Sequence, residues 1–219
     1  MRTARTNAAA ILLPDGKVLV TGGETSGQIA NSLEMFDPKD GAFRLASGVL
    51  SSPRAHHAIA SLPDGQILIA GGSDGNQPLD SVDIFDPATE SVRPAGFMST
   101  RRSDFTATGL PGGRVLITGG TDGASDLATA ELFDAATGRS ESLPSMSVAR
   151  KGHLAIRPPG SDSVLIGGAD SETAEVFEPA TGKFSAATAG TTVTLASIDA
   201  NGKPRHVKSW NLPKNGSRQ

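Results

Sequence analysis

Arginines and acidic residues recur in this sequence at fixed distances from pairs of glycines. An arginine stands 17 residues before the first glycine of each of four Gly-Gly pairs, as Arg5, Arg54, Arg102 and Arg150. Later in each copy come an acid, an apolar residue, a phenylalanine and a second acid, beginning at Glu34, Asp83, Glu131 and Glu175. A guanidinium and a carboxylate satisfy each other's hydrogen bonds when both are buried. We therefore expect each arginine to pair with such an acid within or between copies; the alternative is a basic ring at the mouth of a channel that binds an acidic peptide.

Other side chains suited to chemistry also follow the repeat. His57 and His153 share one repeat position with Ala8 and Phe105, so we expect them to be packed and not to bind a metal. An aspartate follows three of the glycine pairs, as Asp74, Asp122 and Asp170. These carboxylates are expected to cap their turns through neighbouring backbone N–H groups. The alternative is that they gather a calcium ion near an axis, since calcium prefers oxygen ligands.

Binding residues are expected where the copies differ, because a site needs different groups that converge once. His56, Arg101 and Lys151 make one set of loops mildly basic. Ligand specificity is predicted for residues 24–29, 76–80, 122–127 and 170–172. The candidate binding residues are Glu24, His56, Asp74, Arg101, Asp122, Lys151 and Asp170.

Several kinds of catalysis are excluded by composition. The chain has no cysteine and no tyrosine, so thiolate nucleophiles, cysteine-ligated metals and phenol chemistry are absent. It has no Gly-x-Ser-x-Gly elbow, and no helix or Gly-Lys-Ser/Thr follows Gly71-Gly72 to make a phosphate loop. A glycosidase with two carboxylates stays chemically open, although no acid stands out from its repeat. We expect no catalytic residue, no metal and no cofactor.

The elements that position these residues repeat every 48 or 49 residues. The Gly-Gly pairs begin at Gly22, Gly71, Gly119 and Gly167. Each copy is typical of four short strands separated by turns; in the second copy we predict strands over 58–62, 66–70, 81–85 and 91–95. Such a sheet cannot bury both faces alone, but several sheets stacked around an axis can. The fold class is therefore all-β.

The composition and the net charge restrict the classes of partner that the chain could bind. The 219 residues include 26 glycines and 14 prolines, which indicates frequent turns. The net charge of −3 argues against nucleic acid, which is bound through clustered lysine and arginine. No apolar run approaches the roughly 18 residues that span a membrane. No secretory signal follows Met1, so the chain is cytoplasmic unless its true start is missing, in which case it is extracellular or periplasmic.

The motifs together resemble a known family. Met146-Ser-Val-Ala-Arg150 with His153, then a strand, Gly-Gly, Glu-x-Phe-Asp-Pro and Thr-Gly, resemble the kelch repeat of β-propellers. Residues 13–23, Leu-Pro-Asp-Gly-Lys-Val-Leu-Val-Thr-Gly-Gly, are similar to the version in bacterial kelch and galactose-oxidase-like proteins. The resemblance implies a kelch-type β-propeller of four-stranded antiparallel blades, with one domain over 1–212. We predict blades at about 1–48, 49–97, 98–145 and 146–188, a partial fifth at 189–212 with its turn at 201–203, and a disordered tail at 213–219.

The sequence departs from the family in two respects. Kelch propellers usually have six or seven blades, whereas this chain has fewer than five units, so an incomplete, open ring is expected. The family's usual tryptophan on the fourth strand is replaced here by Phe43, Val92, Ser140 and Phe184. An open ring exposes strand edges and an apolar face, which favours self-association; closure with four blades is the alternative.

The resemblance implies a noncatalytic interaction module that binds a protein or a carbohydrate (glycan) ligand through its blade loops. The alternative is a fragment of a secreted carbohydrate-active or oxidase-like propeller enzyme whose active site lies outside this chain. The copper radical oxidases of this fold need a cysteine joined to a tyrosine, and its sialidases a tyrosine nucleophile. Both residue types are absent here.

Overall fold

The computed structural model describes residues 1–168, 171–187, 191–198 and 204–212, with the backbone alone for the last two ranges. The described chain forms four antiparallel sheets of four strands each. The all-β expectation is thus confirmed. The helical content of the described residues is a single 3-10 turn, η1 (Pro111–Gly113), and no helix there has the length and hydropathy of a membrane span.

Each sheet is built from strands that follow one another in the chain. The first sheet contains β1 (Ala9–Leu12), β2 (Val18–Thr21), β5 (Ser32–Asp37) and β6 (Ala42–Val49). The second contains β7 (Ala58–Ser61), β8 (Ile67–Ala70), β9 (Ser81–Asp86) and β10 (Ser91–Phe97). The four strands predicted for the second copy are therefore confirmed, with their ends shifted by one or two residues.

The third and fourth sheets repeat this order. The third contains β11 (Thr106–Gly109), β12 (Arg114–Thr118), β13 (Ala130–Asp134) and β14 (Arg139–Leu143). The fourth contains β15 (Leu154–Ile156), β16 (Val164–Gly168), β17 (Ser171–Glu178) and β18 (Lys183–Ala186). Two small hairpins complete the list: β3 (Glu24–Thr25) with β4 (Gln28–Ile29), and β19 (Thr191–Ile198) with β20 (Pro204–Leu212).

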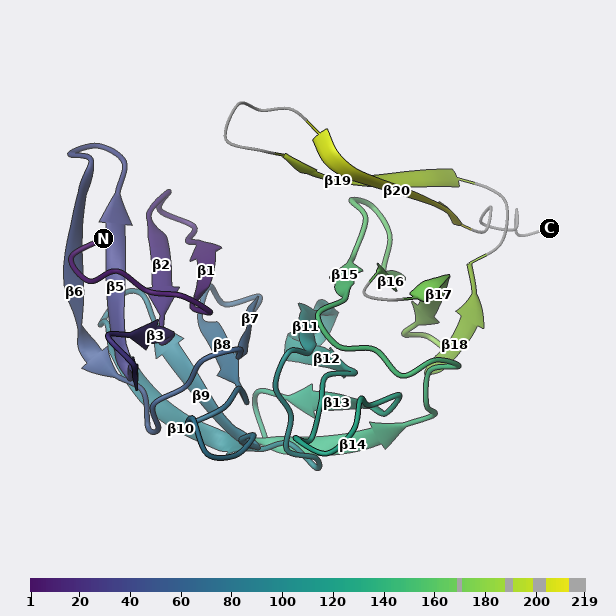
Figure 1. Cartoon of the computed structure of the whole chain (residues 1–219), viewed down its shortest axis with the longest axis horizontal. Coiled ribbons are helices and arrows are strands. Elements are labelled where there is room, and N and C mark those ends of the chain that lie inside the picture. Colours follow the sequence, from purple (N-terminus) through teal and green to yellow (C-terminus); the bar gives the residue numbers. More distant parts are fainter. Residues whose placement is uncertain (169–170, 188–190, 199–203, 213–219) are drawn as a thin grey trace.

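The four sheets stand like spokes around one axis and form an open arc (Figure 1). The first strand of each sheet lies on the inside of the arc, and consecutive inner strands contact one another. The fourth strand of each sheet lies on the outside. The described residues therefore form a propeller segment whose ring is not closed, as the blade arithmetic predicts.

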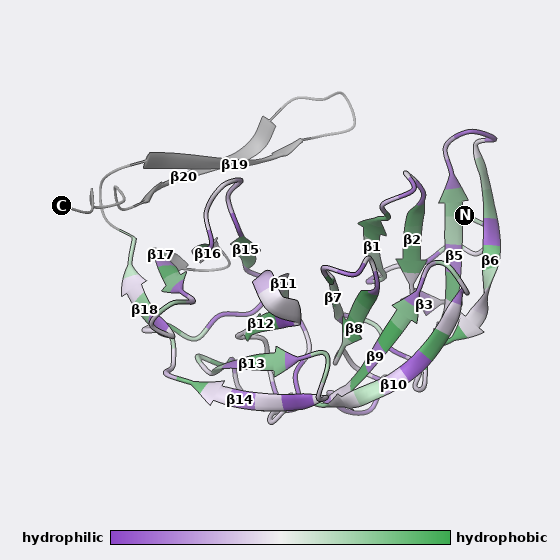
Figure 2. Ribbon diagram, turned by 180° about the vertical axis from the view of Figure 1, so that it is seen from behind, coloured by the Kyte–Doolittle hydropathy of each residue, from purple (hydrophilic) through white to green (hydrophobic). Residues whose placement is uncertain are grey.

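The hydrophobic core consists of layers between neighbouring sheets. Figure 2 shows apolar residues concentrated on the inner and middle strands, such as β2 and β8, with polar residues along the outer strands β10 and β14. One layer joins the first and second sheets, a second joins the second and third, and a third joins the third and fourth. Because each sheet buries its faces against its neighbours, stacking supplies the core that one sheet lacks.

The register of the fourth sheet corrects one sequence alignment. In the third sheet Thr118 pairs with Ala130, and in the fourth Gly167 pairs with Ala174 at the matching position. Gly167 therefore occupies the place of the strand residue before the glycine pair, and Gly168 alone has the positive φ (90°) of a paired glycine. The residue that is missing from this copy is one of the two glycines, and the loop that follows is the shortest of the four.

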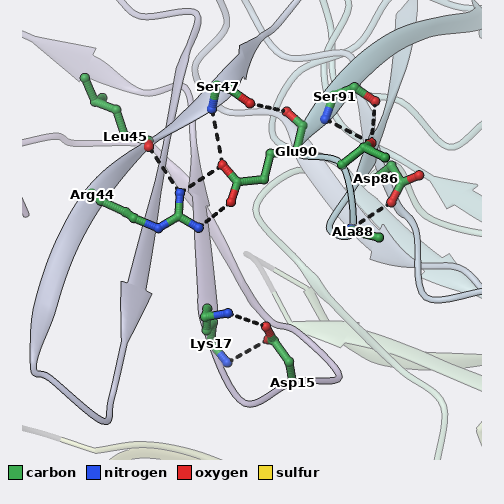
Figure 3. Close-up of polar contacts among 10 residues, drawn as sticks. Asp15, Lys17, Arg44, Leu45, Ser47, Asp86, Ala88, Glu90 and Ser91 are labelled. Atoms are coloured by element: carbon green, nitrogen blue, oxygen red, sulfur yellow. Dashed lines mark hydrogen bonds and ion pairs between the residues drawn. The ribbon is translucent and has the colours of Figure 1, made fainter.

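The outer strands contact the turns of the next sheet. Arg44 on β6 forms an ion pair with Glu90, which lies in the turn between β9 and β10 (Figure 3). Ser47 donates hydrogen bonds to the backbone oxygen and the carboxylate of the same residue. Figure 3 also shows the side chain of Leu45 pointing away from this polar contact.

The partial fifth unit is represented by the hairpin of β19 and β20, with eight and nine residues in its two strands. It follows β18 along the chain and lies beside the open part of the arc (Figure 1). The predicted turn at 201–203 and the predicted disordered tail at 213–219 lie outside the described residues.

Candidate functional site

Buried Arg–carboxylate pairs hold the segments that carry the candidate site. Each repeat arginine pairs with the acid of its own sheet, and all eight side chains are at most 4% exposed. The N···O distances are 3.0, 3.1, 2.7 and 3.2 Å for Arg5–Glu34, Arg54–Asp83, Arg102–Glu131 and Arg150–Glu175. The structural interpretation of the arginines agrees with this geometry. The alternative, a basic ring that receives an acidic peptide, is wrong because burial removes these guanidinium groups from any ligand.

Each pair also fixes the segments around it. Arg102 donates to the backbone oxygens of Gly119 (2.7 Å) and Thr129 (3.3 Å), which tie the glycine pair to the start of β13. Glu131 accepts a further hydrogen bond from the backbone N–H of Ser99 (2.6 Å), in the segment that enters the sheet. The same arrangement recurs in the second sheet, where Ser51 donates to Asp83. The pair therefore holds three stretches of chain at one end of each sheet.

Burial and hydrogen bonding oppose each other in the pKa values of these groups. Burial alone would raise the pKa of Glu131, but hydrogen bonds from Ser140 and Ser99 and the charge of Arg102 hold it below its usual value. The pKa of Glu34 is also lowered, since hydrogen bonds from Arg2, Arg5 and Thr3 outweigh its burial. Both carboxylates thus remain charged in the interior, where they can balance their arginines.

The glycine pairs bring neighbouring sheets together at the base of the loops. The second glycine of each pair donates its N–H to the backbone oxygen of the next sheet's arginine, over 2.8, 2.9 and 2.7 Å for Gly23–Arg54, Gly72–Arg102 and Gly120–Arg150. At Gly119, the first glycine of the third pair, φ is +63°, and an added Cβ would lie 2.4 Å from the backbone oxygen of Arg150 in the next copy. Only glycine fits this close approach.

A second set of backbone hydrogen bonds runs from sheet to sheet around the arc. The residues two positions after each arginine are Asn7, His56, Asp104 and Gly152, and all have φ between 54° and 58°. His56 donates its N–H to Asn7, Asp104 to His56 and Gly152 to Asp104, over 3.0, 3.0 and 2.7 Å. Asparagine, histidine, aspartate and glycine are the types that tolerate this left-handed backbone. The side chains of Asn7, His56 and Asp104 lie at the same end of the sheets as the loops, where Asn7 and His56 contact Glu24.

The predicted basic residues lie at this end of three successive copies, and each has an acidic partner. His56 contacts Asp104 through Nδ1 (2.7 Å) and Glu24 through Nε2 (3.5 Å). The other two ion pairs are Arg101–Asp80 (3.5 Å) and Lys151–Asp126 (3.0 Å). We call the surface formed by Glu24, His56, Asp74, Arg101, Asp122, Lys151 and these partners the rim. The basic side chains of these loops are therefore paired with acids, mostly from the loops after the glycine pairs, and the rim as a whole has six carboxylates and two permanent cations.

The aspartates after the glycine pairs cap their own loops. Asp74 accepts hydrogen bonds from the N–H groups of Asn76 (2.8 Å) and Gln77 (2.9 Å), which lower its pKa. Asp122 does the same for Ala124 and Ser125, both at 2.8 Å, and its pKa is likewise lowered. Asp170 lies outside the described residues. Among the described residues, no group of three or more His, Cys, Asp or Glu side chains is arranged to hold a metal ion.

The repeat histidines lie in the interior, between sheets. His57 Nε2 lies 2.6 Å from the hydroxyl of Thr21 in the preceding sheet. His153 Nε2 lies 3.1 Å from the hydroxyls of both Thr106 and Thr118. Burial, with the nearby charges of Arg54 and His56, lowers the pKa of His57 to about 3; burial and Arg150 lower that of His153 to about 4. Both rings are therefore neutral packing groups, as their exchange for Ala8 and Phe105 in other copies indicates.

Cavities at the opposite end of the sheets repeat and so reflect the architecture. Pockets of about 250 to 290 Å³ lie between the turns of the first and second, second and third, and third and fourth sheets. The first is lined by Asp15, Asp64 and Asp86, and the third by Arg114, Asp162 and Glu178. Each of these pockets is the gap between the turns of two neighbouring sheets.

Asn7 and Asp104 were not predicted from the sequence, whereas Gln77, Asp80 and Asp126 lie within the predicted ranges 76–80 and 122–127 but were not named individually. Arg101 donates to Gln77 Oε1 (2.7 Å), and Asn7 to Glu24 Oε1 (3.1 Å). The signal for Asn7 and Asp104 was present in the sequence, because residues suited to a left-handed backbone stand two positions after every repeat arginine. The other three belong to loops whose partners depend on the packing of neighbouring sheets.

The comparisons with known proteins agree with this architecture. The kelch motif matches residues 5–48 and 53–98, which span the first and second sheets. No curated protein matches the chain. The third and fourth sheets lie beyond the matched residues but have the same strand order and the same buried Arg–carboxylate pair. The kelch motif therefore covers the first and second sheets, and the four four-stranded antiparallel sheets are consistent with the blades of a kelch-type β-propeller.

Proposed function

We propose that the chain is a noncatalytic interaction module whose rim binds a segment of another protein. Kelch repeats are commonly protein-interaction modules. The proposal is supported by the loops that follow the glycine pairs. The same backbone hydrogen bond closes these loops, but the side chains within them differ. Gly72 and Gly120 accept the same hydrogen bond from Leu79 and Leu127, over 2.7 and 2.8 Å, yet the loops between present different side chains. Such loops on a rigid scaffold are where binding residues are commonly found.

The charge of the rim favours a basic partner. Its carboxylates come from Glu24, Asp74, Asp80, Asp104, Asp122 and Asp126, and several are exposed by more than a third. The cations Arg101 and Lys151 are already paired within the rim. A peptide with lysine or arginine would therefore be attracted, whereas an acidic peptide would be repelled.

A peptide array tests this function. Twelve-residue peptides that range from acidic to basic, together with a glycan array, are probed with the native chain and with Asp104→Asn/Asp126→Asn. The expected result is binding to a subset of basic peptides that weakens about tenfold in the variant and falls with added salt. The matched control, Asp40→Asn/Glu141→Gln, removes two exposed carboxylates away from the rim and should bind as the native chain does.

Two results would contradict the proposal. Binding to glycans that the rim variant leaves unchanged would favour the carbohydrate ligand instead. Equal binding of basic peptides by the rim variant and the native chain would show that the rim does not take part in binding. The noncatalytic part of the proposal is contradicted if the purified chain alone hydrolyses a bound glycan.

A further inference from the structure

Three loops of the rim are short hairpins built in the same way. The first and last residues of each hairpin pair across it, as Glu24–Ile29, Ser73–Pro78 and Thr121–Asp126. The residue after each hairpin donates its N–H to the backbone oxygen of the second glycine of the preceding pair, over 2.8, 2.7 and 2.8 Å in the three copies. We call residues 24–29, 73–78 and 121–126 the loop hairpins. Because their construction is the same, they can be compared with one another.

Each loop hairpin is tied to the next copy by an ion pair. An acid in the hairpin, or two residues after it, contacts a basic side chain of the following copy. The three pairs are Glu24–His56, Asp80–Arg101 and Asp126–Lys151, with N···O distances of 3.5, 3.5 and 3.0 Å. Arginine and lysine are charged throughout the physiological pH range, whereas histidine is charged only after it takes up a proton. Of the three hairpins, the first is therefore tied by a cation whose charge depends on pH.

The ring of His56 lies between two carboxylates. Its Nδ1 is 2.7 Å from Asp104 Oδ1, and its Nε2 is 3.5 Å from Glu24 Oε1. The backbone fixes this position, since His56 donates its N–H to Asn7 and accepts one from Asp104, both over 3.0 Å. A charged imidazole has an N–H on both nitrogens, but a neutral ring has only one. Because the contact with Asp104 is the shorter, we expect the neutral ring to keep its N–H there and to present a lone pair to Glu24.

The charges that face this ring come from two other copies. Glu24 lies on β3 of the first copy, and Asp104 lies in the segment before β11 of the third. On the ring's own segment, Arg54 is buried and paired within its sheet, and His57 is neutral because burial lowers its pKa to about 3. Above pH 5 the charge of this group of side chains therefore changes through His56.

Loss of the contact with His56 would leave the base of the first loop hairpin in place. Gly23 donates its N–H to the backbone oxygen of Arg54 (2.8 Å), and Arg54 donates its own to Ala30 (3.1 Å), so the first and second copies stay joined there. Glu24 also keeps the hydrogen bond from the Asn7 side chain of its own copy (3.1 Å). The consequence is local, because the tip of the hairpin is freed while the fold is kept.

We propose that His56 is a pH-dependent tie between the first loop hairpin and the second copy. The protonated ring holds the hairpin through Glu24; when the ring gives its proton to water, this contact is lost and no covalent bond other than N–H changes. Release also removes one positive charge from the rim. The inference rests on the proposed function only for its effect on binding, since a basic segment should be bound more tightly when His56 is neutral.

Amide hydrogen exchange tests the tie without a ligand. It is followed by NMR at pH 5.5 and pH 8 and corrected for the intrinsic pH dependence of exchange. The paired side chains are 34 to 39% exposed and partly screened by water, so we expect residues 25–29 to be about threefold better protected at pH 5.5. The loop hairpins 73–78 and 121–126 are internal controls for any general change in stability. An unchanged ratio of protection between the first hairpin and these two would overturn the proposal.

Two substitutions of His56 separate its proton from its position. His56→Asn introduces the residue type that stands at the same repeat position as Asn7, and it should give the low protection at both pH values. His56→Arg supplies a permanent cation and should give the high protection at both. A pH dependence that persists in His56→Asn would assign the titration to another group and overturn the proposal. Circular dichroism at both pH values establishes that each variant is folded.

Peptide binding tests the effect on the rim. The tightest-binding basic peptide of the array, chosen without histidine, should bind the native chain about threefold more tightly at pH 8 than at pH 5.5, and His56→Asn should remove this difference. If no basic peptide binds at either pH while the exchange still changes, the proposed function fails and the tie stands. If the peptide binds but neither its affinity nor the exchange depends on His56, the tie fails and the proposed function stands.

Discussion

At the scale of single residues, the arginine pairs show how buried charges are held by a repeating fold. Each guanidinium contacts a carboxylate and backbone oxygens of its own sheet. Not every hydrogen-bond donor of these guanidinium groups has a partner. The Nε atoms of Arg54, Arg102 and Arg150 are buried without a partner among the described residues. A pair of this kind stabilises little compared with apolar packing, but losing one partner leaves a buried charge alone. The effect of a pair on the free energy of unfolding is therefore largest when only one of its two residues is substituted.

Arg102→Ala should lower the free energy of unfolding by about 3 to 5 kcal/mol, because Glu131 would remain charged and buried without its cation. Urea denaturation measures this difference. Arg101→Ala is the neighbouring control: that side chain is 55% exposed, and its loss should change stability by less than about 1 kcal/mol. Equal effects of the two substitutions would contradict the structural role of the pair.

The buried histidines predict how stability depends on pH. Their pKa values of about 3 and about 4 lie below the ordinary 6.5, so the unfolded chain binds protons more readily than the folded chain. Stability is retained above pH 6.5 and is lost as the pH falls from 6.5 toward 3 or 4. For each histidine the loss is on the order of 3 to 5 kcal/mol.

His57→Phe should flatten this acid dependence, since phenylalanine occupies the same repeat position at Phe105 in the third sheet. Unfolding is measured in urea from pH 7.5 to 4.5 for the variant and the native chain. The buried carboxylates titrate in both proteins, so the difference between the two slopes isolates the histidine. Parallel slopes would mean that His57 takes up its proton equally well in the folded chain.

At the scale of elements, the glycine pair sets both the end of a strand and the approach of the next sheet. The second glycine donates across the boundary between sheets in three copies. In the fourth copy Gly167 is a ladder residue, and β16 continues through Gly168 almost directly into β17. The four-strand order is therefore kept although this copy has only one glycine with the positive φ of a pair.

Gly120→Ala should destabilise the chain by about 2 to 4 kcal/mol, through a strained backbone and a Cβ within 2.5 Å of a backbone oxygen and 2.7 Å of Phe105 Cβ. Gly113→Ala is the control, because its φ is also positive (78°) but nothing lies within 4 Å of the new Cβ. The control should show only the left-handed backbone cost of about 1 to 2 kcal/mol. Thermal unfolding compares the two variants, and a difference smaller than the error would remove the packing argument.

At the scale of the whole molecule, the repeat predicts the architecture but does not predict most of the contacts within the rim. Period, turns and apolar runs were enough for the four sheets, since each copy has the same strands in the same order. The Arg–carboxylate pairs were expected within or between copies, and only coordinates place each within one sheet. The neutralising partners of His56, Arg101 and Lys151 could not be predicted, because Asp104, Asp80 and Asp126 reach them from loops of other copies. Contacts between copies depend on the rotation from one sheet to the next, which residue spacing does not contain.

The enclosure of each charged pair within one sheet has a consequence for how such chains change over evolution. Contacts across a boundary are largely backbone hydrogen bonds and apolar packing, which do not identify a particular neighbour, and the ion pairs that cross it, such as Arg44–Glu90, are exposed. A duplicated or deleted stretch of about 48 codons would add or remove one self-contained unit without leaving a buried ion stranded. Copy number can thus vary by whole repeats, while the loops of each copy diverge on their own.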